Sequence, residues 1–453
     1  MSKTQGLDMT VGAEWRHILL FSLPIMAGNL LQQLYNTVDG IVVGNYVSQE
    51  ALAATGSAGT LAMLFLAAAI GLGNGAGIML AQLFGARRTD SIRTAATTSL
   101  LLLLGIGAAL SVFGFFASRL LFSALLNVAE GETLDLAVAY FRVYSLGFVL
   151  QFAYNTVAAL LRSLGDSRAT LVFLLVSAVV NLVLDLLFVI VFHWGVVGAA
   201  VATVVSQLAS TAVSFVYMYR RYPLLRPKRG APLFRGSLCA LCLRLGIPAT
   251  VQQCIVGFGN VFVQRLINSF GSATMAAFTA GNRVENYLFV PAVGFNNGMA
   301  TFAAQNTGAR KPERIRRGLF ECIVMSFAIC VALSVCTWIF APGLGRLFGL
   351  DSEALTQTIG YNRFLSWFFW TFACYMPLAG MLQGTGDVNA ALICSLVTLG
   401  IRVALAYVFA GALSWGYAGI WRAMPIGWAS GGALALIRYF TGAWKRKGIT
   451  DLV

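Results

Sequence analysis

A group of polar residues in the first half of the chain could bind a cation inside a membrane: Asp39, Tyr140, Asn181, Asp185 and Thr203. An uncompensated charge at the centre of a bilayer costs roughly 2.5–3.5 kcal/mol, so each buried acid calls for an explanation. Asn181 and Asp185 are four residues apart and share one helix face. Two neighbouring carboxylates cannot both stay ionised cheaply, so one would hold a proton or a cation would lie between them. We therefore predict a coupling site that suits a proton or a sodium ion, the latter held by Asp39, Asn181, Asp185 and Thr203. The competing interpretation is that both aspartates only hydrogen-bond within a helix bundle.

The segments that carry these residues are long and apolar. A hydrocarbon core ~30 Å thick needs about 20 apolar residues in a helix. The runs lack the period-two alternation of membrane strands. Because a helix rises 1.5 Å per residue, four of the five residues lie at a similar depth, ~9–12 Å from the outer surface. We predict twelve helices at about 17–45, 52–84, 93–118, 133–160, 170–192, 195–219, 240–268, 274–305, 316–341, 355–383, 388–411 and 415–440.

Composition supports a protein that is dissolved in lipid. Of 453 residues 58% are hydrophobic and only 11% are charged, and the mean hydropathy is +0.78. A soluble domain carries roughly 25% charged residues. No cleavable signal peptide is expected, because the apolar run near Ile18 is too long and lacks a small-residue cleavage site. The eight cysteines all lie in the second half, mostly inside apolar runs, so neither a zinc site nor a disulfide framework is expected.

The net charge of +14 is distributed by loop. Basic loops, such as the one with Arg310 and Lys311, alternate with acidic ones, such as the one with Glu130 and Glu132. By the positive-inside rule both termini are cytoplasmic, which requires an even number of helices. The charge therefore needs no nucleic-acid partner. We expect a monomer in the bacterial cytoplasmic (inner) membrane, in contact with membrane lipids.

The two halves of the sequence repeat one another. Collinear matches separated by 221–224 residues indicate two six-helix lobes with the same orientation in the membrane, related by an axis along the membrane normal. The predicted division is a first lobe at 1–219, a basic cytoplasmic linker at 220–237 and a second lobe at 238–453. The matches are Pro24 with Pro248, Asn36 with Asn260, Gly71-Leu-Gly-Asn-Gly75 with Gly294-Phe-Asn-Asn-Gly298, Gln82-Leu-Phe-Gly-Ala-Arg87 with Gln305-Asn-Thr-Gly-Ala-Arg310, Tyr140 with Tyr361, Gly165-Asp166 with Gly386-Asp387, and Trp194 with Trp415.

The second half does not repeat the acids. Val263 stands where the first half has Asp39, Ala406 where it has Asp185, and Arg402 where it has Asn181. Arg265 and Arg422 add to the basic positions of this half, for which structural pairing or snorkelling to the membrane surface is the competing interpretation. We expect a substrate cavity with weaker contributions from Gln33, Tyr35, Asn36, Asn155, Arg283, Glu285 and Arg402.

No signature of an enzyme or of a nucleotide-driven pump is present. Gly71-Leu-Gly-Asn-Gly75 loosely matches a dinucleotide fingerprint, but it lies within a membrane segment and is interpreted as close helix packing. His17 and His193 lie at opposite membrane edges, so no histidine metal site is expected. We expect no cofactor, and transport that is ion-driven or passive.

Several motifs resemble the multidrug and toxic compound extrusion (MATE) transporters. They are Leu23-Pro-Ile-Met-Ala-Gly-Asn-Leu-Leu-Gln-Gln-Leu-Tyr-Asn-Thr-Val-Asp39, Val42-Val-Gly-Asn-Tyr46, Gln82-Leu-Phe-Gly-Ala-Arg87, Leu161-Arg-Ser-Leu-Gly-Asp166 and Gln305-Asn-Thr-Gly-Ala309. The resemblance covers essentially the whole chain. It implies an all-α, twelve-helix, V-shaped fold and efflux of organic, often cationic, compounds in exchange for protons or sodium. Asp39, Asn181, Asp185 and Thr203 match the first-lobe cation site of the DNA-damage-inducible (DinF-like) branch, and Tyr140 matches its neighbouring tyrosine.

Three other functions remain as alternatives. A lipid-linked-oligosaccharide flippase of the same superfamily would share the architecture and need a cationic cavity, for which the second-half arginines are candidates. A channel or membrane scaffold would show no ion-coupled accumulation. An intramembrane enzyme would need a nucleophile and a base, and no such set is visible.

Overall fold

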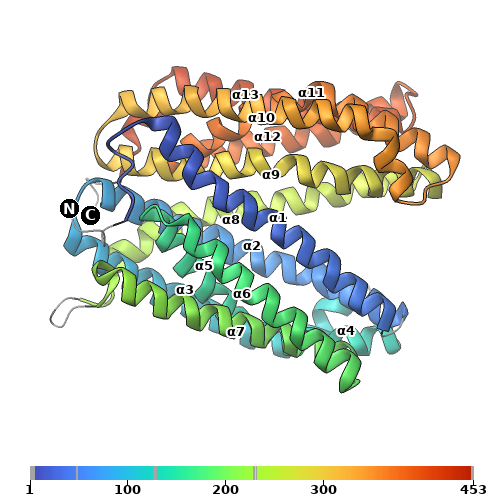
Figure 1. Cartoon of the computed structure of the whole chain (residues 1–453), viewed down its shortest axis with the longest axis horizontal. Coiled ribbons are helices and arrows are strands. Elements are labelled where there is room, and N and C mark those ends of the chain that lie inside the picture. The colour runs from blue at the N-terminus through green and yellow to red at the C-terminus, as the bar shows by residue number, and fades with distance from the viewer. Residues whose placement is uncertain (1–5, 47–48, 126–129, 228–229, 231, 450–453) are drawn as a thin grey trace. The chain divides into compact units, whose positions relative to one another are not determined.

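The computed structural model describes residues 6–46, 49–125, 130–227, 230 and 232–449, with the side chains of 35–46, 49–53, 125, 258 and 347 outside the description. The described residues form helices and no strands. The long helices, labelled in Figure 1, are α1 (Glu14–Tyr46), α2 (Gln49–Gly85), α3 (Thr89–Leu120), α4 (Glu132–Leu146), α5 (Phe148–Ser163), α6 (Ser167–Asp185), α7 (Gly195–Arg221), α8 (Gly236–Asn268), α9 (Ser272–Gly308), α10 (Pro312–Leu347), α11 (Ser352–Gly384), α12 (Val388–Tyr407) and α13 (Ala418–Phe440). With α4 and α5 taken as one bent span, they match the twelve predicted segments.

Most of these helices can cross a bilayer. In the described part of the chain nine are long and apolar enough, and the α4–α5 pair, bent by 45°, makes ten. The two remaining long helices, α9 and α13, carry more polar residues. Pro24, Pro248, Pro291 and Pro377 lie inside helices, as the sequence predicted. The protein is therefore an all-α polytopic membrane protein.

Packing divides the chain into two compact units. Unit 1 contains the described residues up to Asp8 and Ala27–Thr250, and unit 2 contains Met9–Met26 and the residues from Val251 onward. The first part of α1 thus packs within unit 2 and the first part of α8 within unit 1. Contact packing and internal repetition define different divisions, so the repeat-based lobes at 1–219 and 238–453 stay a prediction.

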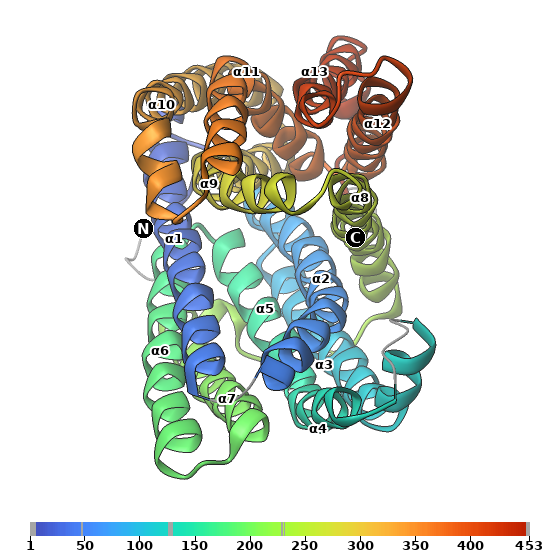
Figure 2. The ribbon, with the colours of Figure 1, turned by 90° about the vertical axis from the view of Figure 1, so that its right-hand side faces the viewer.

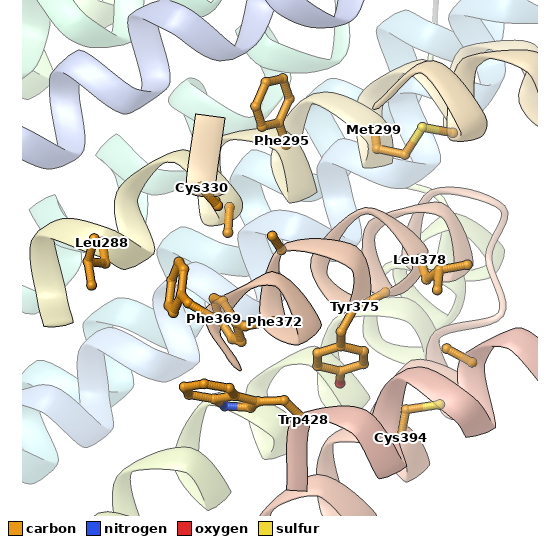
Figure 3. Packing of buried hydrophobic residues seen from close by; sticks show 14 of the residues in the cluster. Leu288, Phe295, Met299, Cys330, Phe369, Phe372, Tyr375, Leu378, Cys394 and Trp428 are labelled. Atoms are coloured by element: carbon orange, nitrogen blue, oxygen red, sulfur yellow. The ribbon is translucent and has the colours of Figure 1, made fainter. Parts of the chain in front are cut away.

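Each unit has its own aromatic core. In unit 1 the ring of Phe65 stacks on Phe148 with centroids 4.4 Å apart. In unit 2 Trp428 lies against Phe369 and Phe372, with centroids 5.9 and 5.2 Å away (Figure 3). Dispersion contacts of this kind hold helices together where lipid removes the hydrophobic driving force. Helices α12 and α13, which run side by side in Figure 2, close this core.

The backbone repeats as the sequence does. Residues with left-handed φ, uncommon outside glycine, occur in pairs at the ends of equivalent helices. Short π-helical segments also follow both α6 and α12, at Leu186–Val191 and Val408–Ala412. The left-handed pairs are Arg87 (57°) with Arg310 (56°), Gly165 (86°) with Gly386 (89°), His193 (54°) with Ser414 (55°), and Gly195 (57°) with Gly416 (58°).

Candidate functional site

The polar centre of unit 1 is built on α6 and α7, which lie side by side (Figure 1). Asn181 and Asp185 are 1% and 2% exposed, although the membrane-spanning part of α6 is largely apolar and outward-facing. Asn181 Nδ2 donates a 3.4 Å hydrogen bond to Thr203 Oγ1, which itself donates to the carbonyl of Ala199 at 3.0 Å. Helical spacing therefore turns an amide and a carboxylate inward toward one hydroxyl.

A break in helix geometry adjoins this centre. Asp185 is the last residue of α6, and the π-helical segment starts at Leu186. Such segments often occur at functional sites, because they change the direction in which side chains project. The break therefore sets the position of the Asp185 carboxylate at the edge of a regular helix.

Tyr140 on α4 lies close to the same elements. It is partly buried against Val189 and Ala199, and its ring stacks on Tyr144 with centroids 5.8 Å apart. Ala199 is also the residue whose carbonyl accepts from Thr203. The side chain of Asp39 lies outside the described residues, so its part in the site stays a prediction.

The weaker cavity residues have varied surroundings. Gln33 is partly buried, and Asn155 donates from Nδ2 to the carbonyl of Gln151 at 2.8 Å, within its own helix. The side chains of Tyr35 and Asn36 lie outside the described residues. Arg283 is exposed while Glu285, two positions later on α9, is only 3% exposed. The two therefore occupy different faces of α9.

Glu285 forms a second polar centre inside unit 2. Tyr361 on α11 is fully buried, and its phenol donates to Glu285 Oε2. The same phenolic oxygen lies 3.4 Å from Asn282 Oδ1 and 3.9 Å from Met424 Sδ. Arg402 on α12 lies within electrostatic range of both Glu285 and Tyr361. Removing one member of a buried charged pair typically costs about 3–5 kcal/mol, so this cluster is strongly interdependent.

The sequence analysis missed the part that Tyr361 plays. It noted the residue only as the repeat partner of Tyr140. The signal was available, because two further unit 1 site positions, Asn181 and Thr203, also have partners 221 residues later, Arg402 and Met424. The carboxylate of unit 2 instead comes from α9, a helix with no acid at the equivalent position of unit 1.

Among the described residues, no group of three or more His, Cys, Asp or Glu side chains could hold a metal ion. The unit 1 centre offers one carboxylate with amide and hydroxyl oxygens. Such a set suits a proton or a weakly held monovalent cation.

Comparison with known proteins adds family membership to this geometry. The MatE family model matches residues 24–187 and again residues 248–408, once in each half of the chain. The chain belongs to the MatE family. Members of this family are transporters, so the MatE chain is a multi-span membrane transporter and not an enzyme.

Relatives of this MatE chain match along most of its length. The probable multidrug resistance protein YpnP of Bacillus subtilis is 28% identical over 97% of this chain and 98% of its own. The FAD transporter of Shewanella oneidensis is 26% identical over 83% and 82%. A solved structure described as the outward-facing conformation of a multidrug resistance MATE family transporter is 27% identical, with a TM-score of 0.92 over 98% of this chain and all of that one.

Proposed function

We propose that this protein is a secondary antiporter that exports organic, often cationic, compounds in exchange for protons or sodium ions. The observation that carries the proposal is the burial of Asp185 beside Asn181 in a membrane-spanning helix, with Asn181 hydrogen-bonded to Thr203. An ionisable residue inside a membrane is expensive and by default marks an ion pathway. The relative named a multidrug resistance protein supports the substrate class.

In this mechanism one ion and one substrate compete through a single conformational equilibrium. Binding of a proton or sodium ion near Asp39 and Asp185 favours the state that releases substrate outward, and substrate binding from the cytoplasm favours release of the ion inward. Coupling of this kind is reciprocal, so each ligand must weaken the other by the same factor. Alternating access then requires one lobe to move against the other around the central path.

The orientation and surroundings belong to the same proposal. We place both termini in the cytoplasm of a bacterial cell, because the basic loops then lie inside. The protein works as a monomer among membrane lipids, and the substrate is a small organic cation or amphiphile. The basic segment at 220–237 lies near anionic headgroups.

Competition between ion and substrate tests the proposal. A fluorescent organic cation is titrated onto the purified protein at several pH values, and then at several sodium concentrations at one pH. We expect its affinity to fall as the coupling ion is added, and Asp185→Asn to remove that dependence. Affinity that is indifferent to both ions in the wild type would refute the antiport proposal.

A flippase for lipid-linked oligosaccharides is the second candidate, favoured by the exposed arginines Arg265, Arg283 and Arg422 of unit 2. Labelled lipid-linked sugars are reconstituted with the protein in vesicles, and their crossing is followed with an impermeant quencher. Crossing without any ion-dependent binding of organic cations would favour this candidate over the antiporter.

A further inference from the structure

Unit 2 contains a polar centre that corresponds, position by position, to the proposed cation site of unit 1. Tyr361, Arg402 and Met424 each follow Tyr140, Asn181 and Thr203 by 221 residues. The structure brings these three residues of unit 2 around one carboxylate, that of Glu285. The two centres therefore share a scaffold but differ in charge.

The difference is that unit 2 carries a cation of its own. Where unit 1 has the neutral amide of Asn181, unit 2 has the guanidinium of Arg402. Glu285 Oε2 accepts from Tyr361, while Glu285 Oε1 and Arg402 Nε are buried and form no hydrogen bond with the described residues. The carboxylate is thus compensated mainly through space by the arginine.

The surrounding helices are shaped to hold this cluster. A Cβ atom on Gly281 of α9 would lie 2.4 Å from Cδ1 of the Tyr361 ring, so this glycine makes room for the ring one turn before Glu285. A Cβ atom on Gly427 of α13 would lie 3.0 Å from Cβ of Arg402. Trp421 packs edge-on against Tyr361 with centroids 5.4 Å apart. The arginine stem and the phenol are therefore held between closely packed helices.

We infer that Glu285 and Tyr361 form a latent site for a monovalent organic cation of the guanidinium type, and that the side chain of Arg402 permanently fills it as a tethered cation. Unit 1 keeps the equivalent position open with Asn181. The bound charge of unit 2 is thus part of the chain, whereas that of unit 1 is exchangeable. The last statement rests on the proposed antiport, but the filled site does not.

Removing the tethered cation should open the site to an external one. Arg402→Ala leaves the Glu285 carboxylate buried with Tyr361 as its hydrogen-bond donor. Methylguanidinium then replaces the lost group, whereas choline, with no N–H donor, does not. The readout is the melting temperature of the purified protein in detergent with millimolar methylguanidinium chloride, against equal choline chloride. We expect Arg402→Ala to melt lower than the wild type and to be raised saturably by methylguanidinium, at an affinity about tenfold above that for choline.

Three matched variants make the test specific. Arg402→Lys keeps a tethered charge and should respond to neither salt, like the wild type. Glu285→Gln combined with Arg402→Ala removes both charges and should lose the response. Arg402→Asn, which copies unit 1, should respond like Arg402→Ala and serves if the alanine variant does not fold. An equal response with and without Glu285, or none in either Arg402 variant, would overturn the inference. Because the readout is binding without transport, its failure is distinguishable from failure of the antiport proposal.

Discussion

Arg438 holds the carboxylate of Asp387 through two charge-assisted hydrogen bonds, from Nε to Oδ2 at 2.7 Å and from Nη2 to Oδ1 at 3.2 Å. The Asp387 side chain is 4% exposed and that of Arg438 33%. The equivalent positions of unit 1, 221 residues earlier, hold Asp166 and Tyr217, whose phenol donates to Asp166 Oδ2 at 2.8 Å. One structural contact thus exists as an ion pair in unit 2 and as a hydrogen bond to a phenol in unit 1.

The ion pair should contribute more to stability than the phenol contact. We expect Arg438→Ala to cost about 3 kcal/mol, because it leaves a buried carboxylate without its cation. Tyr217→Phe should cost only about 1 kcal/mol, since Asp166 keeps its bonds from Tyr222 and from the backbone N–H of Ala169. Thermal melting in detergent compares the two variants. Equal losses would show that Asp387 does not depend on its charge partner.

Close backbone packing between α2 and the first part of α8 gives a second prediction. A Cβ atom on Gly75 would lie 2.5 Å from the backbone N of Gly246, and one on Gly71 would lie 2.4 Å from that of Thr250. Gly75→Ala should therefore destabilise unit 1 by about 2–3 kcal/mol, because backbone atoms cannot move aside easily. Gly59→Ala on the same helix is the control, with no neighbouring atom within 4 Å, and should be neutral or slightly stabilising. A tolerated Gly75→Ala would contradict the crossing.

The hydrogen bond between Asn181 and Thr203 should tune ion binding without creating it. Thr203→Val keeps the shape of the side chain but loses the acceptor, at a cost of about 1 kcal/mol or ~5-fold in ion affinity. Asp185→Asn should abolish ion dependence altogether. Ion affinity is obtained from the pH or sodium dependence of substrate binding. A larger loss for Thr203→Val than for Asp185→Asn would shift the site away from the carboxylate.

Tyr222, just beyond the end of α7, should make stability depend on alkaline pH. Burial, and then the charge of Asp166, raise the pKa of this phenol. A raised pKa means that the folded protein keeps a proton that the unfolded chain loses near pH ~10, so the contribution is present below that pH and is lost above it. Melting temperature is measured from neutral to alkaline pH. Tyr222→Phe should flatten the alkaline fall, and an unchanged profile would assign the fall to other groups.

Hydropathy and loop charge were enough to predict the twelve segments, because lipid demands long apolar helices whatever their packing. They could not predict the bend at Gly147 or the π-helical segment after Asp185, which depend on local packing. Arg119, an exception to the predicted charge pattern, pairs with Glu130 at 2.6 Å and with Asp135 at 3.3 Å, contacts that depend on the turn between α3 and α4.

The candidate sites divide in the same way. Helical spacing placed Asn181 and Asp185 on one buried face, since that relation is local. The contact between Glu285 and Tyr361 joins residues far apart in sequence, and no periodicity predicts which helices meet. The family was predicted from motifs and is confirmed, while the DinF-like branch, the coupling ion and the orientation stay predictions.

Ion-driven efflux from proteoliposomes tests the central claim most directly. A fluorescent organic cation is loaded, and its exit is followed under an imposed pH gradient and then under a sodium gradient. The wild type is compared with Asp185→Asn and with Asp135→Asn, a control whose exposed carboxylate pairs only with Arg119 among the printed ion pairs of the described residues. We predict that one gradient drives efflux by the wild type and by Asp135→Asn but not by Asp185→Asn. Efflux by Asp185→Asn at the wild-type rate, or no response to either gradient, would contradict the account.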